Sequence, residues 1–483
     1  MSTLRKKTFD GVVWSAIQRF GTMAVTLVSN IVLARLLTPE DYGCIGMLMI
    51  FIALSNTFID GGFGSALIQK KEPTSVDYST IFYWNIFLSI ILYGVLFITA
   101  PFIASFYRMP LLAPVLRLMG LVLFFKAFCI IQANQTRKQL QFRKLAIINV
   151  ISSVLSLVLA IVAAYKGLGV WSLVIQQLAL DLFNAIFYWI ASKWRPLFVF
   201  SWESIKELFR FGGFMLLSNL FSSFSNEIQG LLVGRMFNPA TMGLYSQAYR
   251  LEGSAATATS SIIDQVTYPV LASLQDDKDS FIAALKRFIQ IPAFVCSLIM
   301  MIMIVVAKPL IILLFSQKWV DCVSYFQILC TAGLAVCLQG SANNAIAAVG
   351  KSKVLMTWTI VKRSLTIVLC MAGIWIGGMN GLLLGCVLGA WSVYFINAYL
   401  LSRHVGYSFV SQVFDILPFI ILAVCVGTFS FHIGSLVNLD MYIVAIIQIC
   451  IATSLYLLFS WLFKFDSFIY LLDLLSNRLK KGK

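Results

Sequence analysis

The sequence has few charged residues and almost no histidine. Asp, Glu, Lys and Arg make up only 12% of the 483 residues, about half the share found in a soluble domain. The two histidines, His404 and His432, are far apart in the chain, so a histidine-based catalytic centre or metal site is not expected. The segment Val349–Ser352 resembles the tail of a phosphate-binding loop, but Ala345 stands where that motif needs its leading glycine. We therefore expect no nucleotide site, no cofactor and no metal.

Long polar loops and paired cysteines are also missing. No loop exceeds about twenty residues, which leaves no room for a catalytic domain outside a membrane. The ten cysteines form no C-x-x-C pair, and we expect them to pack as small apolar residues. These absences predict a transporter and not an enzyme.

Apolar residues dominate the chain and account for 60% of it. They form fourteen stretches, each near the ~20 residues that an α-helix needs to cross a bilayer. A membrane β-barrel would instead show alternating segments of ~10 residues. We predict an all-α integral membrane protein with about 14 transmembrane helices, at 11–36, 42–68, 80–105, 112–133, 145–165, 168–191, 207–234, 242–271, 288–315, 323–348, 354–376, 381–401, 412–434 and 441–463.

The basic residues show how the protein is oriented in the membrane. With fourteen spans, 26 Lys and Arg residues fall on the side of the N-terminus and six on the other. Cytoplasmic loops carry this excess, so the sequence predicts a multi-pass protein of the bacterial inner (cytoplasmic) membrane with both termini cytoplasmic. The net charge of +16 is spread over many short loops and is not gathered on one face. We therefore expect no nucleic-acid partner.

One segment of the chain recurs 200 residues later. Val32–Gly43 and Leu232–Gly243 share Arg, Pro and Gly in identical register. A weaker echo aligns Asn134 with Asn343. We expect Arg35 and Arg235 to cap helix carbonyls, the proline to end a helix and the glycine to open the next one.

The two copies of each repeat are separated by six predicted spans, so they have the same orientation in the membrane. The sequence therefore predicts two parallel-repeat six-helix lobes around a central cavity. The N-lobe covers 1–200 with helices one to six, and the C-lobe covers 201–405 with helices seven to twelve. Residues 406–483 add helices thirteen and fourteen and a basic cytoplasmic tail.

Several polar residues lie inside the predicted spans, where an ionisable side chain is costly and points to a function. The candidate cargo-binding residues are Arg19, Lys126, Asn219, Asn226 and Arg250. Asn219 and Asn226 belong to a polar stripe on helix seven, and Arg forks match the geometry of phosphate. Each Arg could instead pair with an acid of its own lobe, for example Arg19 with Asp60, and Lys126 could extend to the membrane surface.

Three acids are candidates for coupling an ion to transport. They are Asp60, Glu227 and Asp264. A buried carboxylic acid can be poised to exchange a proton or bind sodium, but each of the three could also be a structural partner of a nearby cation. Hydroxyls near Arg250 and Asp264, such as Ser254, could line a passage or bond back to their own helix.

Two motifs and two shorter features carry a family resemblance. The run Ile31–Gly43, followed by Asp60–Gln69, resembles the opening of the polysaccharide-type flippases, which belong to the multidrug/oligosaccharidyl-lipid/polysaccharide exporter superfamily. Trp14 and the segment Gln135–Lys144 are similar to the same family. The resemblance extends over the whole chain through the span count and the repeat.

The resemblance implies a function in the biosynthesis of surface polysaccharides such as O-antigen (lipopolysaccharide biosynthesis), capsule or teichuronic-like polymers. The expected cargo is an oligosaccharide linked to undecaprenyl pyrophosphate, moved from the cytoplasmic to the outer face by alternating access. Relatives hold the pyrophosphate with cations of the first and eighth helices, where Arg19 and Arg250 lie. Membrane lipid, and possible partners among polysaccharide polymerases and chain-length proteins, follow from the same resemblance.

Three other functions stay open at the level of sequence. An ion-coupled multidrug or organic-cation exporter of the same fold would be expected to place acids, not Arg19, in helix one. A membrane polysaccharide polymerase usually needs a larger outer loop than the dozen residues available here. A non-transporting scaffold of an envelope synthesis complex would tolerate charge-neutral replacements in the cavity.

Overall fold

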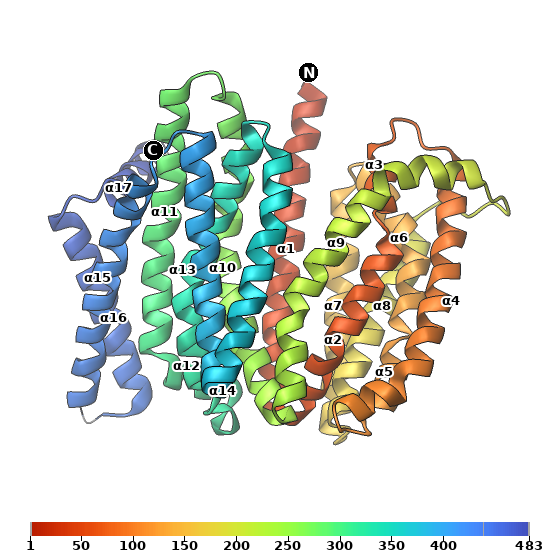
Figure 1. The fold of residues 1–483 in the computed structure, drawn as a ribbon, viewed down its shortest axis with the longest axis horizontal. Coiled ribbons are helices and arrows are strands. Elements are labelled where there is room, and N and C mark those ends of the chain that lie inside the picture. Colours follow the sequence, from red (N-terminus) through yellow and green to blue (C-terminus); the bar gives the residue numbers. More distant parts are fainter. Residues whose placement is uncertain (1, 438, 482–483) are drawn as a thin grey trace. The chain divides into compact units, whose positions relative to one another are not determined.

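The structure is a computed structural model that describes residues 2–437 and 439–481. Side chains are described except at 2–10, 12, 65, 210–211, 214, 261–265, 352–353, 356 and 474–481. The described chain is helical throughout and contains no strand (Figure 1). It forms two compact units, Met1–Gly243 and Leu244–Lys483. The all-α membrane fold predicted from the sequence is confirmed.

The first unit contains nine helices of the described chain and the start of a tenth. They are α1 (Ser2–Leu36), α2 (Pro39–Asp60), α3 (Phe63–Gln69), α4 (Ser75–Phe106), α5 (Leu112–Met119), α6 (Val122–Lys138), α7 (Phe142–Tyr165), α8 (Val170–Ala191), α9 (Trp202–Met236) and the first turn of α10 (Pro239–Ser273). The sequence prediction ends the N-lobe at residue 200. In the structure α9 packs on α2, α3 and α4, and therefore belongs to the first compact unit. The lobe boundaries stay a prediction.

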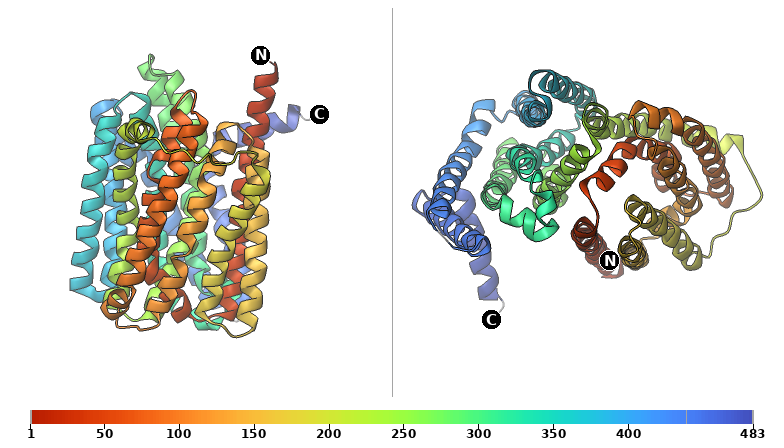
Figure 2. Two further views of the ribbon diagram at one scale, coloured as in Figure 1. Left: turned by 90° about the vertical axis from the view of Figure 1, so that its right-hand side faces the viewer. Right: turned by 90° about the horizontal axis from the view of Figure 1, so that it is seen from below.

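The second unit contains the rest of α10 and the helices that follow it. They are α11 (Lys278–Val305), α12 (Ala307–Phe315), a 3₁₀ turn (Gln317–Trp319), α13 (Cys322–Ala348), α14 (Ser352–His404), α15 (Phe409–Leu436), α16 (Met441–Leu462) and α17 (Asp466–Lys481). Helix α11 packs against α13 and α15, and α15 packs against α16. Most helices of each unit are seen end-on in the right-hand view of Figure 2, so within a unit they run roughly parallel.

Eleven helical segments of the described chain are long and apolar enough to cross a membrane. One of them, Thr357–His404, is bent at Gly377 and Gly378, where the backbone leaves helical geometry. That break lies between the two spans predicted at 354–376 and 381–401. Helices α9 and α10 are each 35 residues long but are not among the eleven. The count of fourteen spans stays a prediction.

The repeated Arg-x-x-x-Pro-x-x-x-Gly segment has a different local structure from the one expected. Pro39 is the first residue of α2, where its missing N–H costs nothing, and does not end α1. Thr38 caps this helix and forms a reciprocal capping box with Asp41. Gly43 lies one turn inside the helix and does not open it. The glycine therefore has a packing role and not a capping role.

The two arginines of the repeat lie in the last turns of their helices, as expected. Arg35 is in the last turn of α1 and Arg235 in that of α9, where a cation is favourable beside the exposed carbonyls. The Arg235 guanidinium also lies 4.9 Å from the ring centroid of Phe106. Both side chains are exposed at these helix ends.

Candidate transport site

The middle of α1 carries an exposed cation, Arg19. Arg19 is exposed, and no described side chain forms a hydrogen bond or ion pair with it. The neighbouring Thr22 hydroxyl bonds back to the Gln18 carbonyl at 2.7 Å. The alternative of a buried Arg19–Asp60 pair is not observed. Arg19 therefore has its full donor set available on the surface of the first unit.

Helix α9 carries Asn219, Ser223 and Asn226 on one face, but these residues differ in burial. Asn219 and Asn226 are exposed, whereas the half-buried Ser223 shares a hydrogen bond of 2.9 Å with Thr57 of α2. Glu227 is half-buried and takes part in an interaction. The two asparagines are thus the amides of this helix that are accessible to a ligand.

Helix α10 contains the second predicted cargo cation. Arg250 is half-buried, and its carbonyl accepts a hydrogen bond of 2.7 Å from the Ser254 hydroxyl. Ser254 therefore bonds back to its own helix. Of the two alternatives, bonding to the helix or lining a passage, this is the structural one. The side chain of Asp264 lies outside the described residues, so its assignment as a coupling acid stays a prediction.

A cluster of polar residues lies where α2, α3, α6 and α8 meet. The charge of Lys126 acts electrostatically on both Asp60 and Asp181, although neither acid is within ion-pair distance of it. Asp181 accepts a hydrogen bond of 2.9 Å from Gln177. Lys126 is half-buried, and its two predicted roles, contact with cargo or extension to the membrane surface, stay predictions. Arg137 also acts electrostatically on Asp60.

Asn134 completes this cluster and was not singled out as a site residue by the sequence. A Cβ placed on Gly64 would lie 2.6 Å from Asn134 Nδ2 and 3.0 Å from Asp60 Oδ1, so only glycine leaves room for both side chains. The Asn134 amide nitrogen is buried without a hydrogen-bond partner in the described structure, as is the amide oxygen of Asn343. These two asparagines are the pair aligned by the weaker repeat. That alignment is the feature of the sequence that could have indicated them as site residues.

Two further buried polar groups of the second unit were not predicted as sites. Glu252 of α10 is only 5% exposed, and its Oε1 has no hydrogen-bond partner among the described residues. This oxygen lies 3.0 Å from the position of a Cβ on Gly333. Lys362, which lies within the span predicted at 354–376, is buried in α14 and donates to Asn397 Oδ1 at 2.8 Å.

An apolar cavity of about 560 Å³ opens between α11, α13, α14 and α15. Its walls include Met301, Leu334, Trp391, Val424 and Phe431. Few polar groups reach it, so the cavity suits a hydrocarbon chain better than a sugar or a phosphate.

The fold resembles that of known membrane transporters. A solved structure of the lipid II flippase MurJ in an inward closed conformation matches with a TM-score of 0.73, covers 94% of this chain and 99% of its own, and is 14% identical. An inward-facing multidrug resistance MATE family transporter of the MOP superfamily matches with a TM-score of 0.63 at 19% identity, covering 82% of this chain and 98% of its own. At these identities the likeness concerns the fold alone.

The sequence also matches a protein family. The model of the family described as "Polysaccharide biosynthesis protein" matches residues 32–324, which is more than half of the chain. The protein belongs to this family. The family resemblance read from the motifs is thereby confirmed.

Curated relatives come from several bacteria. The teichuronic acid biosynthesis protein TuaB of Bacillus subtilis (strain 168) is 24% identical over 74% of this chain and 74% of its own. The lipopolysaccharide biosynthesis protein WzxC of Escherichia coli (strain K12) is 25% identical over 82% and 80%. The succinoglycan biosynthesis transport protein ExoT of Rhizobium meliloti (strain 1021) is 24% identical over 86% and 83%.

Proposed function

We propose that this protein is a transporter that flips a lipid-linked oligosaccharide across the bacterial inner membrane for surface polysaccharide biosynthesis. The relatives are named for the biosynthesis of teichuronic acid, lipopolysaccharide and succinoglycan, and one is named a transport protein. The matched fold is that of a lipid II flippase and of drug transporters. The specific cargo we propose is an oligosaccharide on undecaprenyl pyrophosphate, moved by alternating access with both termini in the cytoplasm.

The exposed Arg19, which pairs with no described side chain, carries this proposal. An arginine in the middle of an apolar helix is costly unless it faces water or an anion. A pyrophosphate offers several anionic oxygens, and the planar guanidinium can donate to two of them at once. Arg250 supplies the second predicted cation, with its side chain half-buried in α10.

The sugars and the lipid tail of the proposed cargo require two further surfaces, one polar and one apolar. The amides of Asn219 and Asn226 are exposed on α9 and can donate to and accept from sugar hydroxyls. The apolar cavity between α11 and α15 can take part of the lipid tail. Lys126 stays a predicted cargo contact, but its charge already acts on Asp60 and Asp181. A polymerase and chain-length proteins are proposed partners on the outer face.

The proposal is tested in a deletion strain complemented with the parent gene, Arg19→Ala, Arg250→Ala or the matched control Arg403→Ala. Arg403 is an exposed arginine in the last turn of α14 and has no place in the proposed site. We expect the deletion and both site variants to lose polymer display and to accumulate lipid-linked intermediates on the cytoplasmic face, while the control is normal. Normal display in the deletion strain would contradict the proposed flippase function. Normal display by inserted Arg19→Ala and Arg250→Ala variants would contradict the site.

An exporter of organic cations is the second candidate, because the fold is also that of multidrug transporters. Such an exporter binds positively charged cargo, which Arg19 would repel. The two functions are separated by measuring efflux of a cationic dye in the same strains. Dye efflux that depends on this chain, together with unchanged polymer display, would favour the exporter.

A further inference from the structure

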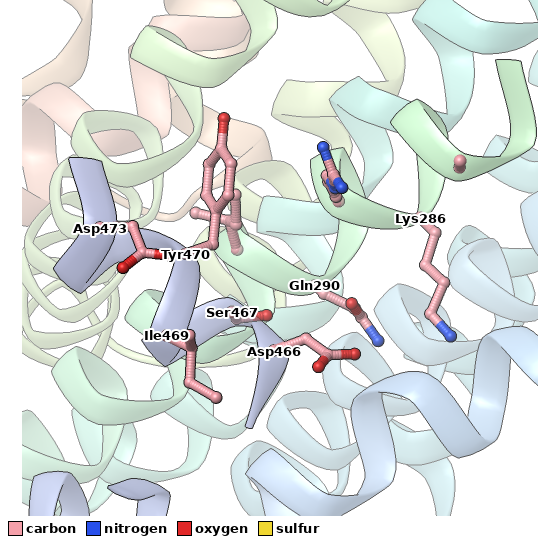
Figure 3. A pocket seen from close by; sticks show the side chains of 10 residues that line it. Lys286, Gln290, Asp466, Ser467, Ile469, Tyr470 and Asp473 are labelled. Carbon is pink, nitrogen blue, oxygen red and sulfur yellow. The ribbon is translucent and has the colours of Figure 1, made fainter. Parts of the chain in front are cut away.

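A second cavity of about 500 Å³ lies between α11 and α17 in the second unit (Figure 3). It is separate from the residues assigned to cargo. The polar and charged residues on its walls include Lys286 and Arg287 from α11 and Asp466, Ser467, Tyr470 and Asp473 from α17. Side chains from the two helices surround the space between them in the close view of Figure 3.

The two walls of this cavity have opposite charge. Helix α11 contributes two cations and α17 contributes two acids. The ammonium of Lys286 forms an ion pair of 2.8 Å with Asp415, which uses one of its three donors. The guanidinium of Arg287 lies 5.4 Å from the ring centroid of Tyr470, a stacking that leaves its edge donors available. A ligand complementary to both walls carries an anion at one end and a cation at the other.

Ser467 gives an independent indication of a ligand. Its side chain is only 4% exposed, it lines the cavity, and its Oγ has no hydrogen-bond partner among the described residues. A buried hydroxyl without a partner costs free energy that a hydrogen bond to a bound group would restore. The carboxylate of Asp466, on the preceding residue, is exposed at the same cavity.

The position of the cavity relative to the apolar residues favours a lipid over a soluble ligand. Lys286 and Arg287 directly precede the span predicted to begin at residue 288, where the interface of a membrane is expected. Next to the cavity, α17 exposes Ile469 and Leu472, which are 40% and 43% exposed. A helix with apolar and charged sides and exposed aliphatic residues at a membrane surface is typical of an interfacial helix.

We propose that this cavity binds the head group of a zwitterionic phospholipid with a primary ammonium, of the phosphatidylethanolamine type. The phosphate accepts hydrogen bonds from Arg287, Lys286 and the Ser467 hydroxyl, and the ammonium donates to the carboxylates of Asp466 and Asp473. The acyl chains leave the cavity along the exposed aliphatic residues of α17. This site is independent of the proposed flippase function and would hold for any transport activity.

The chemistry of the α17 wall distinguishes this lipid from others. A phosphatidylcholine has the same charges, but its quaternary ammonium has no N–H to donate to the two carboxylates. A phosphatidylglycerol has no ammonium group, and its negative charge would be repelled by the carboxylates of Asp466 and Asp473. The cavity is therefore expected to prefer the primary ammonium lipid over both.

The test uses the purified full-length protein in nanodiscs made from equal parts of the three lipids, followed by quantification of the lipid that remains bound after transfer to detergent. We expect phosphatidylethanolamine to be enriched over phosphatidylcholine. The Asp466→Asn/Asp473→Asn variant should reduce that enrichment about tenfold, because two charge-assisted hydrogen bonds are weakened. Asp321→Asn, an exposed acid before α13, is the matched control and should retain the parental enrichment.

A second variant, Ser467→Ala, controls for the case in which the double asparagine variant loses lipid only because α17 detaches from α11. It removes the partnerless hydroxyl, keeps the charges, and should weaken binding of both zwitterionic lipids to a similar extent. Equal retention of phosphatidylethanolamine and phosphatidylcholine by the parent would overturn the proposal. So would enrichment of phosphatidylglycerol that is unchanged in the double asparagine variant, because the cavity would then be a simple anion site.

Discussion

Gly43 and Gly243 occupy reciprocal positions in the first unit. A Cβ on Gly43 would lie 1.8 Å from the carbonyl oxygen of Pro239, and a Cβ on Gly243 would lie 1.8 Å from that of Pro39. Each glycine therefore packs on the proline that begins the helix of the other. The two copies of the sequence repeat meet in one symmetric backbone contact, as expected of elements related by a twofold axis.

Gly43→Ala is expected to destabilise the protein strongly. The added methyl group would collide with a backbone oxygen, which cannot rotate away, so the loss should exceed the ~1–3 kcal/mol typical of overpacking. Thermal unfolding of the purified protein measures it. Gly94→Ala is the matched control, because a Cβ there meets nothing within 4 Å. Equal melting temperatures for the two variants would show that the helices of the repeat do not pack this closely.

Lys126 and Asp181 are expected to show a favourable energetic coupling. In a double-mutant cycle of Lys126→Met, Asp181→Asn and the double variant, the interaction energy should be roughly 0.5–3 kcal/mol. The reason is that Lys126→Met leaves Asp60 and Asp181 without the cation that acts on both. Unfolding free energies of the four proteins supply the measurement. Strict additivity would mean that Lys126 is available to cargo and does not compensate these acids.

Glu252→Gln is expected to leave the melting temperature unchanged or to raise it. The Oε1 of this buried carboxyl group has no hydrogen-bond partner among the described residues, and an amide of the same shape avoids the cost of placing a charge there. Glu207→Gln serves as the comparison, since it removes the negative charge of an ion pair of 2.9 Å with Lys70 and should lower stability slightly. A marked loss of stability in Glu252→Gln alone would indicate that the carboxylate has a partner in the membrane.

Lys70→Met should lower stability by more than the about 0.2–1 kcal/mol usual for exposed ion pairs, because the side chain of its partner Asp77 is only 3% exposed. Lys70 lies in the loop before α4 and contacts Asp77 at 3.0 Å and Glu207 at 2.9 Å. Desolvation lowers the pKa of Lys70, but the hydrogen bonds to Glu207 and Asp77 raise it by a larger amount. The pKa of Lys70 therefore lies above its ordinary value of 10.5.

The sign of this shift determines the pH dependence. A lysine with a raised pKa stabilises the folded state fully below its ordinary pKa and loses that contribution only as the pH rises through the folded value. The difference between Lys70→Met and the parent should therefore stay constant between about pH 7 and 9. Melting curves at several pH values check this. A difference that disappears within this interval would show that the ion pairs do not form in solution.

Much of the fold could be predicted because its signals are local in the sequence. Runs of apolar residues determine which segments can cross a membrane, and the break at Gly377 and Gly378 falls between two predicted spans. The repeat around Pro39 and Pro239 was visible as a spacing of three residue types. Its local structure was predicted wrongly, because a glycine selected for close packing looks the same in sequence as one selected for a turn.

The sequence could predict which types of residue form the candidate site, but not which other residues they contact. The intramembrane position of Arg19 follows from the sequence, whereas its lack of a partner depends on where the helices place Asp60. The burial of Glu252, whose Oε1 has no partner in the described part of the chain, and the cavity between α11 and α17 left no signal that single-residue chemistry could detect. Each depends on side chains that are distant in the chain and close in space.

By itself the sequence determined that this is a helical membrane protein with an internal repeat and cations in its apolar helices, because hydropathy and residue spacing are properties of the chain alone. Only the tertiary structure decided which of those polar groups are exposed, shared or buried without a partner. It also decided that Gly43 and Gly243 pack on each other's prolines. These features arise from packing between distant helices, which sets the free energy of each polar group through its neighbours and not through its position in the sequence.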